Sequence, residues 1–304
     1  MKLAALAGIA LSAALTGCAA TAPVPPAPRP VTIPAIPDSL NGVYEPGAPA
    51  SYAGITRFAA ATGAAPELAL YYSAWFERFA AGFAAQAHAH GAVPFVQIQS
   101  GREPLAGITA GRFDAFLRAY ALSVKAYGHP VVLSFDHEMN GGWYPWGAGH
   151  TAPAVYIAAW RHVVGVFRAV GASNVTWMWT VNSTNVATDS LRQWWPGSAY
   201  VGWVGIDGYY YYSTDTFASV FGATVAQVRK FTTAPVLIAE TAVGTTADRD
   251  AQITGLFAGV KADKLLGLVW FDEKQDKGVY HQDWRLENDP PALAAYRAAV
   301  KAAR

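Results

Sequence analysis

The stretch Val131-Val132-Leu133-Ser134-Phe135-Asp136-His137-Glu138-Met139-Asn140 decides the fold class of this 304-residue chain. Its first half is an apolar, β-branched run, and its second half is polar. An apolar run of this length is typical of a parallel strand that is buried on both faces. The helical stretch 153–170 follows and stops at Gly171, a residue that often ends helices in the left-handed conformation. The segment therefore predicts one strand-helix unit.

The same alternation recurs along the chain, with predicted strand onsets mostly about 25 to 45 residues apart, the size of one βα unit. The predicted strands are Gly42–Tyr44, Leu68–Tyr72, Val93–Ile98, Val131–Phe135, Val175–Thr180, Val204–Asp207, Val236–Ala239 and Leu268–Phe271. The predicted helices are Tyr52–Thr62, Phe76–His90, Ala110–Tyr127, Pro153–Val170, Asp189–Trp195, Phe217–Phe231, Ala247–Asp263 and Pro291–Ala303.

Eight such units in a single domain predict an α/β protein with a (β/α)8 TIM barrel. The alternative is a doubly wound open sheet. That fold usually carries a Gly-rich phosphate loop after an early strand, and the sequence has none. The barrel is therefore the expected architecture.

The composition restricts the possible functions. Lys and Arg number 22 against 21 Asp and Glu, so the chain has no basic excess for nucleic acid. Apolar residues make up 53% and charged residues 14%, which excludes disorder over most of the length. Cys18 is the only cysteine, so disulfide scaffolds and sites made of several thiolates are excluded. We expect neither a metal nor a cofactor.

The N-terminus has the pattern of an export signal. A basic start and a short apolar stretch precede Leu15-Thr16-Gly17-Cys18, which resembles a bacterial lipoprotein cleavage box, with Cys18 as the lipidated residue. We therefore predict a signal peptide over 1–17, a Pro-rich linker over 18–37 and the barrel domain over 38–304. The expected product is an extracytoplasmic monomer that touches a membrane only through the lipid. The alternative is a plain secretory signal with a chance cysteine.

Two glutamates directly follow predicted strands. Glu138 follows the fourth strand and Glu240 the seventh, a separation of 102 residues. In a barrel, both would emerge at the carboxyl ends of the strands, where active sites of this fold lie. Two carboxyls about 5–5.5 Å apart are the catalytic pair of retaining glycosidases. Either glutamate alone could instead cap a helix or form an ion pair.

Aromatic side chains gather at the same strand ends. Trp143 and Trp146 follow Glu138, Tyr209 follows the sixth strand, and Trp270 lies in the eighth. Exposed aromatic surface invites association in a solvent loop, whereas it suits the C–H faces of sugars. The alternative for each ring is packing in the core. We expect Asp207 to be a hydrogen-bonding support.

The segment His137-Glu138-Met139-Asn140-Gly141-Gly142-Trp143-Tyr144-Pro145-Trp146-Gly147 resembles the acid/base motif of glycoside hydrolase family 26, best known for endo-β-1,4-mannanases. Two further segments match in order and spacing. Gly205-Ile206-Asp207-Gly208-Tyr209 resembles the family's strand-six tyrosine motif, and Ile238-Ala239-Glu240-Thr241 resembles its nucleophile motif. The resemblance extends over residues 40–290.

The resemblance implies a retaining enzyme without a cofactor. Glu138 would be the acid/base and Glu240 the nucleophile. The implied neighbours are His137, which positions the acid/base; Asn140, which borders the site; Trp143, a sugar platform; Tyr209, which bonds the nucleophile; and Trp270, the floor of the central subsite.

One departure bears on the substrate. Many mannanases of the family carry a substrate-contacting His on a strand before the acid/base strand, where this chain offers Gln97 and Gln99. We expect β-1,4-mannan as the polysaccharide substrate. Mixed-linkage β-1,3-1,4-glucan and β-1,3-xylan are the alternatives, and a saccharide-binding lipoprotein without activity is the alternative from another class.

Overall fold

The computed structural model describes residues 33–183, 190–276 and 281–303. Eight parallel strands close into a barrel in sequence order, β1 next to β2 and so on until β8 pairs with β1. The closed ring confirms the predicted barrel and excludes the open sheet. The strands are β1 Leu40–Tyr44, β2 Leu68–Ala74, β3 Val93–Gln99, β4 Val131–Phe135, β5 Val175–Asn182, β6 Trp203–Asp207, β7 Val236–Thr241 and β8 Gly267–Phe271.

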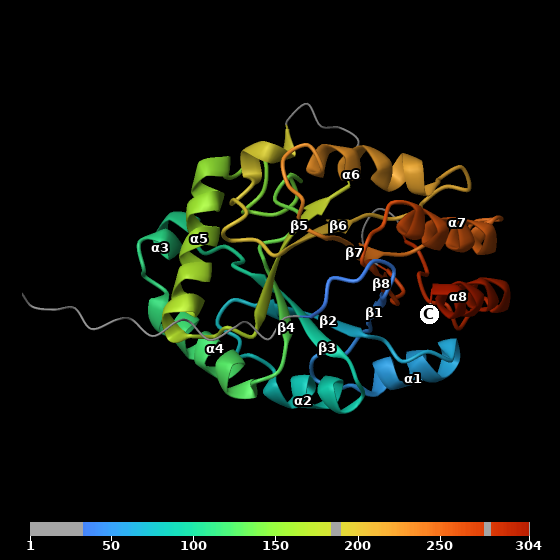
Figure 1. Ribbon diagram of the computed structural model, residues 1–304, viewed down its shortest axis with the longest axis horizontal. Helices are drawn as coiled ribbons and strands as arrows, with labels where there is room; N and C mark the ends of the chain where they lie inside the picture. Colours follow the sequence, from blue (N-terminus) through green and yellow to red (C-terminus); the bar gives the residue numbers. More distant parts are fainter. Residues whose placement is uncertain (1–32, 184–189, 277–280, 304) are drawn as a thin grey trace, which may run out of the picture.

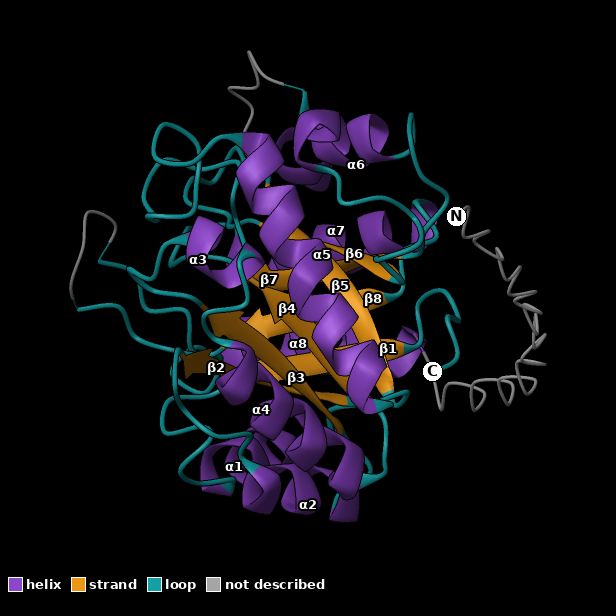
Figure 2. Ribbon diagram, turned by 90° about the vertical axis from the view of Figure 1, so that its left-hand side faces the viewer, coloured by secondary structure: helices purple, strands orange, loops and turns teal. Residues whose placement is uncertain are grey.

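Helices surround the ring of strands (Figures 1 and 2). They are α1 Ala53–Thr62, α2 Ala81–Ala89, α3 Leu105–Thr109, α4 Asp114–Tyr127, α5 Pro153–Val170, α6 Ala223–Val228, α7 Arg249–Ala262 and α8 Pro290–Ala303, with the short helices η1 Leu191–Trp194 and η2 Ala218–Gly222. No helix among the described residues has the length and apolar character needed to cross a membrane.

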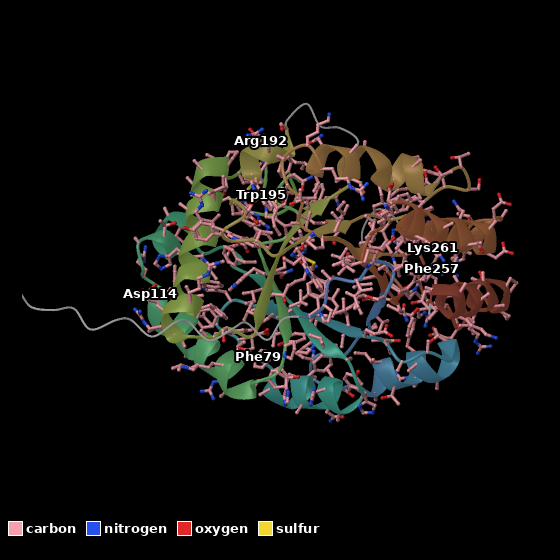
Figure 3. All side chains as sticks on the ribbon, in the orientation of Figure 1. Phe79, Asp114, Arg192, Trp195, Phe257 and Lys261 are labelled. Atoms are coloured by element: carbon pink, nitrogen blue, oxygen red, sulfur yellow. The ribbon has the colours of Figure 1, made fainter. Side chains whose placement is uncertain are left out.

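Two apolar layers hold the domain together. The inner one fills the barrel and includes Leu70, Phe95, Val132 and Met178, all fully buried. The outer one lies between strands and helices, where side chains fill the space (Figure 3). Phe257 of α7 belongs to this outer layer, while Lys261 on the same helix is exposed. Because both faces of each strand are buried, the strand sequences are apolar nearly throughout.

Three predicted helices differ from the structure. The predicted helix over 76–90 begins only at Ala81, because Phe76 has a φ of +70°, which no right-handed helix contains. The predicted helix over 110–127 is preceded by the unpredicted α3. The predicted helix over 189–195 is a 3₁₀ turn over Leu191–Trp194, and its first residue lies outside the described residues.

The start of the barrel domain is tied to its last third. The main-chain N–H of Asp38 donates to the carbonyl of Leu265, and that of Leu40 donates to Leu266. The predicted signal peptide, Cys18 and most of the predicted linker lie outside the described residues.

Candidate active site

A cleft of about 630 Å³ opens at the carboxyl ends of the strands. Glu138 and Glu240 both line it, as the strand-end argument predicts. Its other lining residues come from the end of β5, from η2 and from the loops after β4, β5, β6 and β8. They are Trp143, Tyr144, Asn182, Ser183, Gly208, Tyr209, Tyr211, Tyr212, Asp215, Ser219, Val220 and Gln275.

A bulge in β7 directs Glu240 toward the barrel axis. Along β6, Ile206 pairs with Ile238 and Asp207 with Glu240, so β7 contains one extra residue there. The pairing with β8 shifts across the same segment. Without the bulge, the alternation that buries Ala239 inside the barrel would point Glu240 outward.

Two tyrosines hold the carboxylate of Glu240. The phenol of Tyr209 donates to Oε1, and the phenol of Tyr72 donates to Oε2. Tyr209 comes from the loop after β6 and Tyr72 from β2, so the contacts approach from opposite parts of the ring. Both oxygens of the carboxylate are therefore oriented before any ligand arrives.

Different donors hold the carboxyl of Glu138. The Asn182 amide donates to Oε1 at 2.6 Å, and the Trp143 indole donates to Oε2 at 2.8 Å. Glu138 itself has a φ of +54°, a left-handed conformation that a non-glycine residue rarely adopts. The Trp143 ring lies against Gly141, where a Cβ atom would come within 2.3 Å of the indole. Gly141 is thus required for the ring to reach Glu138.

Burial raises the pKa of both carboxyls. The pKa of Glu240 rises to about 7, first through burial and then through the charge of Glu138, while the Tyr209 and Tyr72 phenols counter the rise. Burial also raises the pKa of Glu138, against the donation from Asn182 and Trp143. Such a pair can hold one carboxylate and one carboxylic acid near neutral pH, which is the requirement for a nucleophile beside a proton donor.

A third acid lies beneath this pair. Asp207 is fully buried, and neither of its oxygens has a hydrogen-bond partner of normal geometry among the described residues. Burial, then the charges of Glu240 and Glu138, raise its pKa well above the usual range, and the Gln97 amide partly counters the rise. Burial and the two neighbouring carboxyls thus favour the neutral form of Asp207, and its expected role as a hydrogen-bonding support stays a prediction.

His137 is a neutral ring packed among aromatics. Burial lowers its pKa to about 3, and the ring lies 5.1 Å from Tyr144 and 5.8 Å from Tyr72, measured between ring centroids. His137 thus precedes Glu138 in the chain and contacts Tyr72, the tyrosine that donates to Glu240. The preceding residue, Asp136, is fixed by the N–H and hydroxyl of Ser100 at 2.7 and 2.8 Å.

Of four further predicted site residues, Trp143 lines the cleft, whereas Asn140, Gln97 and Gln99 are not among its lining residues. Trp143 is 52% exposed in the cleft, as expected for a platform. Asn140 instead clamps the main chain of Asn182 through two hydrogen bonds of 2.8 Å, so it supports the amide that holds Glu138. Gln99 is half-buried at the end of β3 and Gln97 lies fully buried below it.

Two predicted sugar contacts are wrong. Trp146 is 3% exposed, stacks on Tyr144, and donates its indole N–H to the carbonyl of His137. Trp270 is fully buried in the outer layer, where its ring meets Tyr296 of α8. Its neighbour Phe271 is the residue of β8 that stacks on Tyr44. Trp270 points outward because the alternation along β8 puts Val269 inside the barrel.

Three residues that support the site were not predicted from the sequence. Tyr72 and Asn182 hold the two glutamates, and both lie near the carboxyl ends of strands, so the rule that found the glutamates could have found them. The ring of Trp284 packs against Tyr209 with centroids 4.8 Å apart. It carries no such signal, because Trp284 lies outside the strands and its main-chain carbonyl is held by Arg249.

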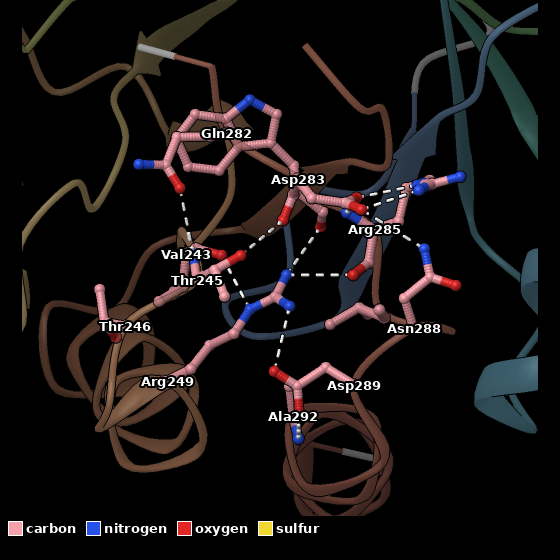
Figure 4. Close-up of polar contacts among 12 residues, drawn as sticks. Val243, Thr245, Thr246, Arg249, Gln282, Asp283, Arg285, Asn288, Asp289 and Ala292 are labelled. Carbon is pink, nitrogen blue, oxygen red and sulfur yellow. Dashed lines mark hydrogen bonds and ion pairs between the residues drawn. The ribbon is translucent and has the colours of Figure 1, made fainter. Parts of the chain in front are cut away.

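The buried guanidinium of Arg249 secures the loop that carries Trp284. It donates to the carbonyls of Val243, Trp284 and Arg285 at 3.0 to 3.2 Å and to the carboxylate of Asp289 at 3.2 Å. Figure 4 shows these bonds converging on one side chain. Arg249 thus links the start of α7 to the loop whose Trp284 ring packs against Tyr209.

Within the described ranges, no group of three or more His, Cys, Asp or Glu side chains could hold a metal ion. The two glutamates of the cleft accept hydrogen bonds from tyrosine, tryptophan and asparagine side chains.

Comparisons with known proteins place the chain in a family and identify similar folds. The family model described as glycosyl hydrolase family 26 matches residues 113–289. Endoglucanase H of Acetivibrio thermocellus is 37% identical over 213 residues, which is 64% of this chain and 23% of that protein. Mannan endo-1,4-beta-mannosidase A and B of Caldalkalibacillus mannanilyticus is 35% identical over 90 residues, which is 27% of this chain and 17% of that protein. The matches thus span less than a quarter of these curated relatives.

Among solved structures, an endo-beta-1,4-mannanase double mutant of Cellulomonas fimi superposes with a TM-score of 0.68 at 18% identity, over 86% of this chain and 70% of that one. The catalytic domain of the endo-beta-1,4-mannanase of Bacillus sp. JAMB-750 gives a TM-score of 0.66 at 16% identity, over 86% and 85%. At these identities the likeness concerns the fold.

Proposed function

The chain belongs to glycosyl hydrolase family 26, and from that premise we propose that it is a retaining glycosidase that cleaves β-linked polysaccharide. The observation that carries the proposal is that one cleft contains two buried carboxyls, each held by different hydrogen-bond donors. Glu240 is held by two phenols, and Glu138 is held by an amide and an indole.

The reaction proceeds in two displacements. In the first, a carboxylate oxygen of Glu240 attacks the anomeric carbon while Glu138 gives its proton to the leaving glycosidic oxygen, which departs as an alcohol. In the second, Glu138, now ionised, removes a proton from water, and the water oxygen displaces Glu240 at the anomeric carbon. Two inversions leave the anomeric configuration unchanged.

The assigned roles follow from the two motifs that contain Glu138 and Glu240, and the environment of each carboxyl is compatible with its role. The phenols of Tyr209 and Tyr72 favour the charged form of Glu240, as a nucleophile requires. Burial raises the pKa of Glu138 and so favours its protonated form, against the donation from Asn182 and Trp143.

We propose that the substrate is β-1,4-mannan, cleaved by endo hydrolysis. Support comes from the 90-residue match to a relative named as a mannan endo-1,4-beta-mannosidase and from the motifs that resemble those of the family best known for endo-β-1,4-mannanases. The second candidate is a β-glucan. It is favoured by the longer match to a protein named as an endoglucanase and by the glutamines at 97 and 99, where many mannanases of the family have a substrate-contacting His.

The test is turnover on a panel of mannan, mixed-linkage glucan, β-1,4-glucan and β-1,3-xylan, with the anomer of the first product read by proton NMR. We expect the β-anomer to form first, and Glu240→Ala to lower turnover by orders of magnitude while oligosaccharide binding persists. Glu103→Ala, outside the cleft, is the matched control. Formation of the α-anomer first, or a normal rate for Glu240→Ala, contradicts the mechanism, and the preferred polysaccharide decides between mannan and glucan.

We further propose that the protein is exported and anchored by lipid at Cys18 as a monomer. The support is the sequence pattern alone, since residues 1–32 lie outside the described ranges. Cys18→Ser is expected to abolish incorporation of labelled palmitate and to release the protein from the membrane fraction. Membrane retention of this variant without label contradicts the lipid anchor.

A further inference from the structure

Tyr212 is the most exposed large side chain of the cleft, with 67% of its surface open to solvent. It follows β6 by five residues and stands three residues beyond Tyr209, which bonds Glu240. Exposed tyrosine surface in contact with water contributes nothing to folding. Its place in the cleft is therefore notable, because the other large aromatic lining residue with half or more of its surface exposed is the platform Trp143.

The loop that carries Tyr212 is rigid by its hydrogen bonds. The carboxylate of Asp215 accepts the main-chain N–H groups of Tyr211 and Tyr212 at 2.7 and 2.8 Å. The buried amide of Gln252, on α7, donates to the carbonyls of Tyr212 and Asp215 at 2.8 and 2.9 Å. Thr246 in turn donates to the Gln252 side chain at 2.6 Å. The ring is thus presented by a fixed backbone, which lowers the entropy lost when a ligand binds.

The same wall of the cleft connects Tyr212 with the acid/base. Asn182 donates to the carboxyl of Glu138, and the next residue, Ser183, donates its main-chain N–H to the main-chain carbonyl of Asp207 at 2.8 Å. Ser183 lies so close to Gly208 that a Cβ there would come within 2.3 Å of the hydroxyl oxygen. The lining of the cleft therefore continues from Glu138 through Asn182, Ser183 and Gly208 to the Tyr212 loop.

We infer that this direction is the side of the departing sugar. The acid/base protonates the glycosidic oxygen, so the part of the glycan that leaves extends from Glu138. A tyrosine ring offers a sugar a large apolar face at low conformational cost. We propose that Tyr212 is the aromatic platform of a subsite for the leaving part of the glycan, one that takes a neutral β-linked hexose unit beyond the cleaved bond. This rests on the proposed function.

The kinetic test compares Tyr212→Ala with Tyr212→Phe on two kinds of substrate. On a β-linked oligosaccharide, Tyr212→Ala is expected to lower kcat/KM about tenfold, mainly through KM, and Tyr212→Phe to restore it. On an activated aryl glycoside, which has no sugar on the leaving side, both variants are expected to match the wild type. Phe76→Ala is the matched control, because Phe76 is 58% exposed and does not line the cleft.

A second test reads acceptor binding directly. The glycosyl-enzyme can pass its sugar to an added oligosaccharide that occupies the leaving side, so Tyr212→Ala is expected to lower the ratio of transfer to hydrolysis. Calorimetry in the inactive Glu240→Ala background is expected to show about tenfold weaker oligosaccharide binding when Tyr212 is also replaced.

The outcomes separate the two proposals. If the wild type hydrolyses no β-glycan, the proposed function fails whatever Tyr212 does. If the wild type is active and Tyr212→Ala retains full kcat/KM and transfer ratio, only the subsite is overturned. An equal loss on oligosaccharide and aryl glycoside also overturns it, because that pattern means disturbed catalysis rather than a lost leaving-side contact.

Discussion

The phenol of Tyr72 donates a hydrogen bond to Oε2 of Glu240, a residue 168 positions later in the chain. Tyr209 donates to the other oxygen. The carboxyl that we assign as nucleophile thus carries a phenol on each oxygen, although burial and the charge of Glu138 both favour its neutral form. The hydrogen bonds from Tyr72 and Tyr209 lower the pKa of Glu240 and so favour its charged form.

Tyr72→Phe is therefore expected to raise the pKa of Glu240 above its value of about 7. Since only ionised Glu240 can attack, activity is lost as the pH falls through this pKa. The acid limb of kcat/KM is expected to move about one unit toward alkaline pH. The measurement is a pH-rate profile on an aryl glycoside.

Tyr44→Phe is the matched control for this variant. Tyr44 packs edge-on against Tyr72 with centroids 5.2 Å apart, and no hydrogen bond from its hydroxyl to Glu240 is present. The acid limb of the kcat/KM pH profile of Tyr44→Phe is expected to match that of the wild type. The ionisable groups that interact electrostatically with Glu240 are Glu138, Asp207, Glu273, Tyr44, Tyr72, Tyr144 and Tyr209. An unmoved acid limb in Tyr72→Phe would rule out the role of Tyr72.

Glu138→Gln tests the proton donor. The amide retains most of the side-chain shape but has no acidic proton, so substrates with poor leaving groups are expected to lose several orders of magnitude in kcat/KM. Activated aryl glycosides need no proton for the first displacement and are expected to lose far less in that step. Pre-steady-state release of the aryl group measures it. Equal losses on both substrate types contradict the assigned role.

Asp272 makes folding stability depend on pH. Burial, then the nearby Glu45 and Glu287, raise its pKa to about 9, and its carboxylate accepts the main-chain N–H of Leu286 at 3.0 Å. Because the folded protein holds this proton more tightly than the unfolded chain, the stabilisation is complete at acid pH and is lost as the pH rises toward 9. Melting temperatures are expected to fall between pH 6 and pH 9.

Asp272→Asn is expected to reduce that fall by on the order of 5 °C, because the amide retains an acceptor for Leu286 and has no proton to lose. The exposed Asp250→Asn is the control and is expected to retain the wild-type slope. If Asp272→Asn retains the full alkaline fall, another group causes it.

Arg249→Met removes the guanidinium that bonds three carbonyls and the Asp289 carboxylate. The buried carbonyls and the carboxylate then lose their donors, so the free energy of unfolding is expected to fall by about 3 kcal/mol. Urea denaturation measures the change. Arg118→Met, at an exposed ion pair on α4, is expected to change it by less than about 1 kcal/mol, and a similar small change for Arg249→Met contradicts the bracing role.

The sequence predicted the barrel and the two glutamates for the same reason. Parallel strands bury both faces, so the strands stand out as apolar runs, and polar residues at their ends mark the open face. Because both faces of each strand are apolar, the sequence did not show which side chains point into the barrel and which point toward the helices. Trp270 and Phe271 are adjacent and both aromatic, and only the pairing of β8 reveals which of them faces the axis.

Long-range contacts were equally hidden. Tyr72 meets Glu240 only after the ring closes, and Arg249 braces Trp284 from 35 residues away. The helix predicted from Phe76 failed because a positive φ at that residue cannot be read from an apolar pattern. Local patterns thus located the open face, whereas tertiary pairing decided which neighbours support each carboxyl.

The left-handed backbone at Glu138 has a consequence for engineering. Asn or Gly adopts that conformation more readily than glutamate does, so either residue at position 138 relieves the strain and removes the proton donor in a single step. A screen that rewards heat resistance alone would accept such dead variants as improvements. Directed evolution of this protein therefore has to score turnover in every round.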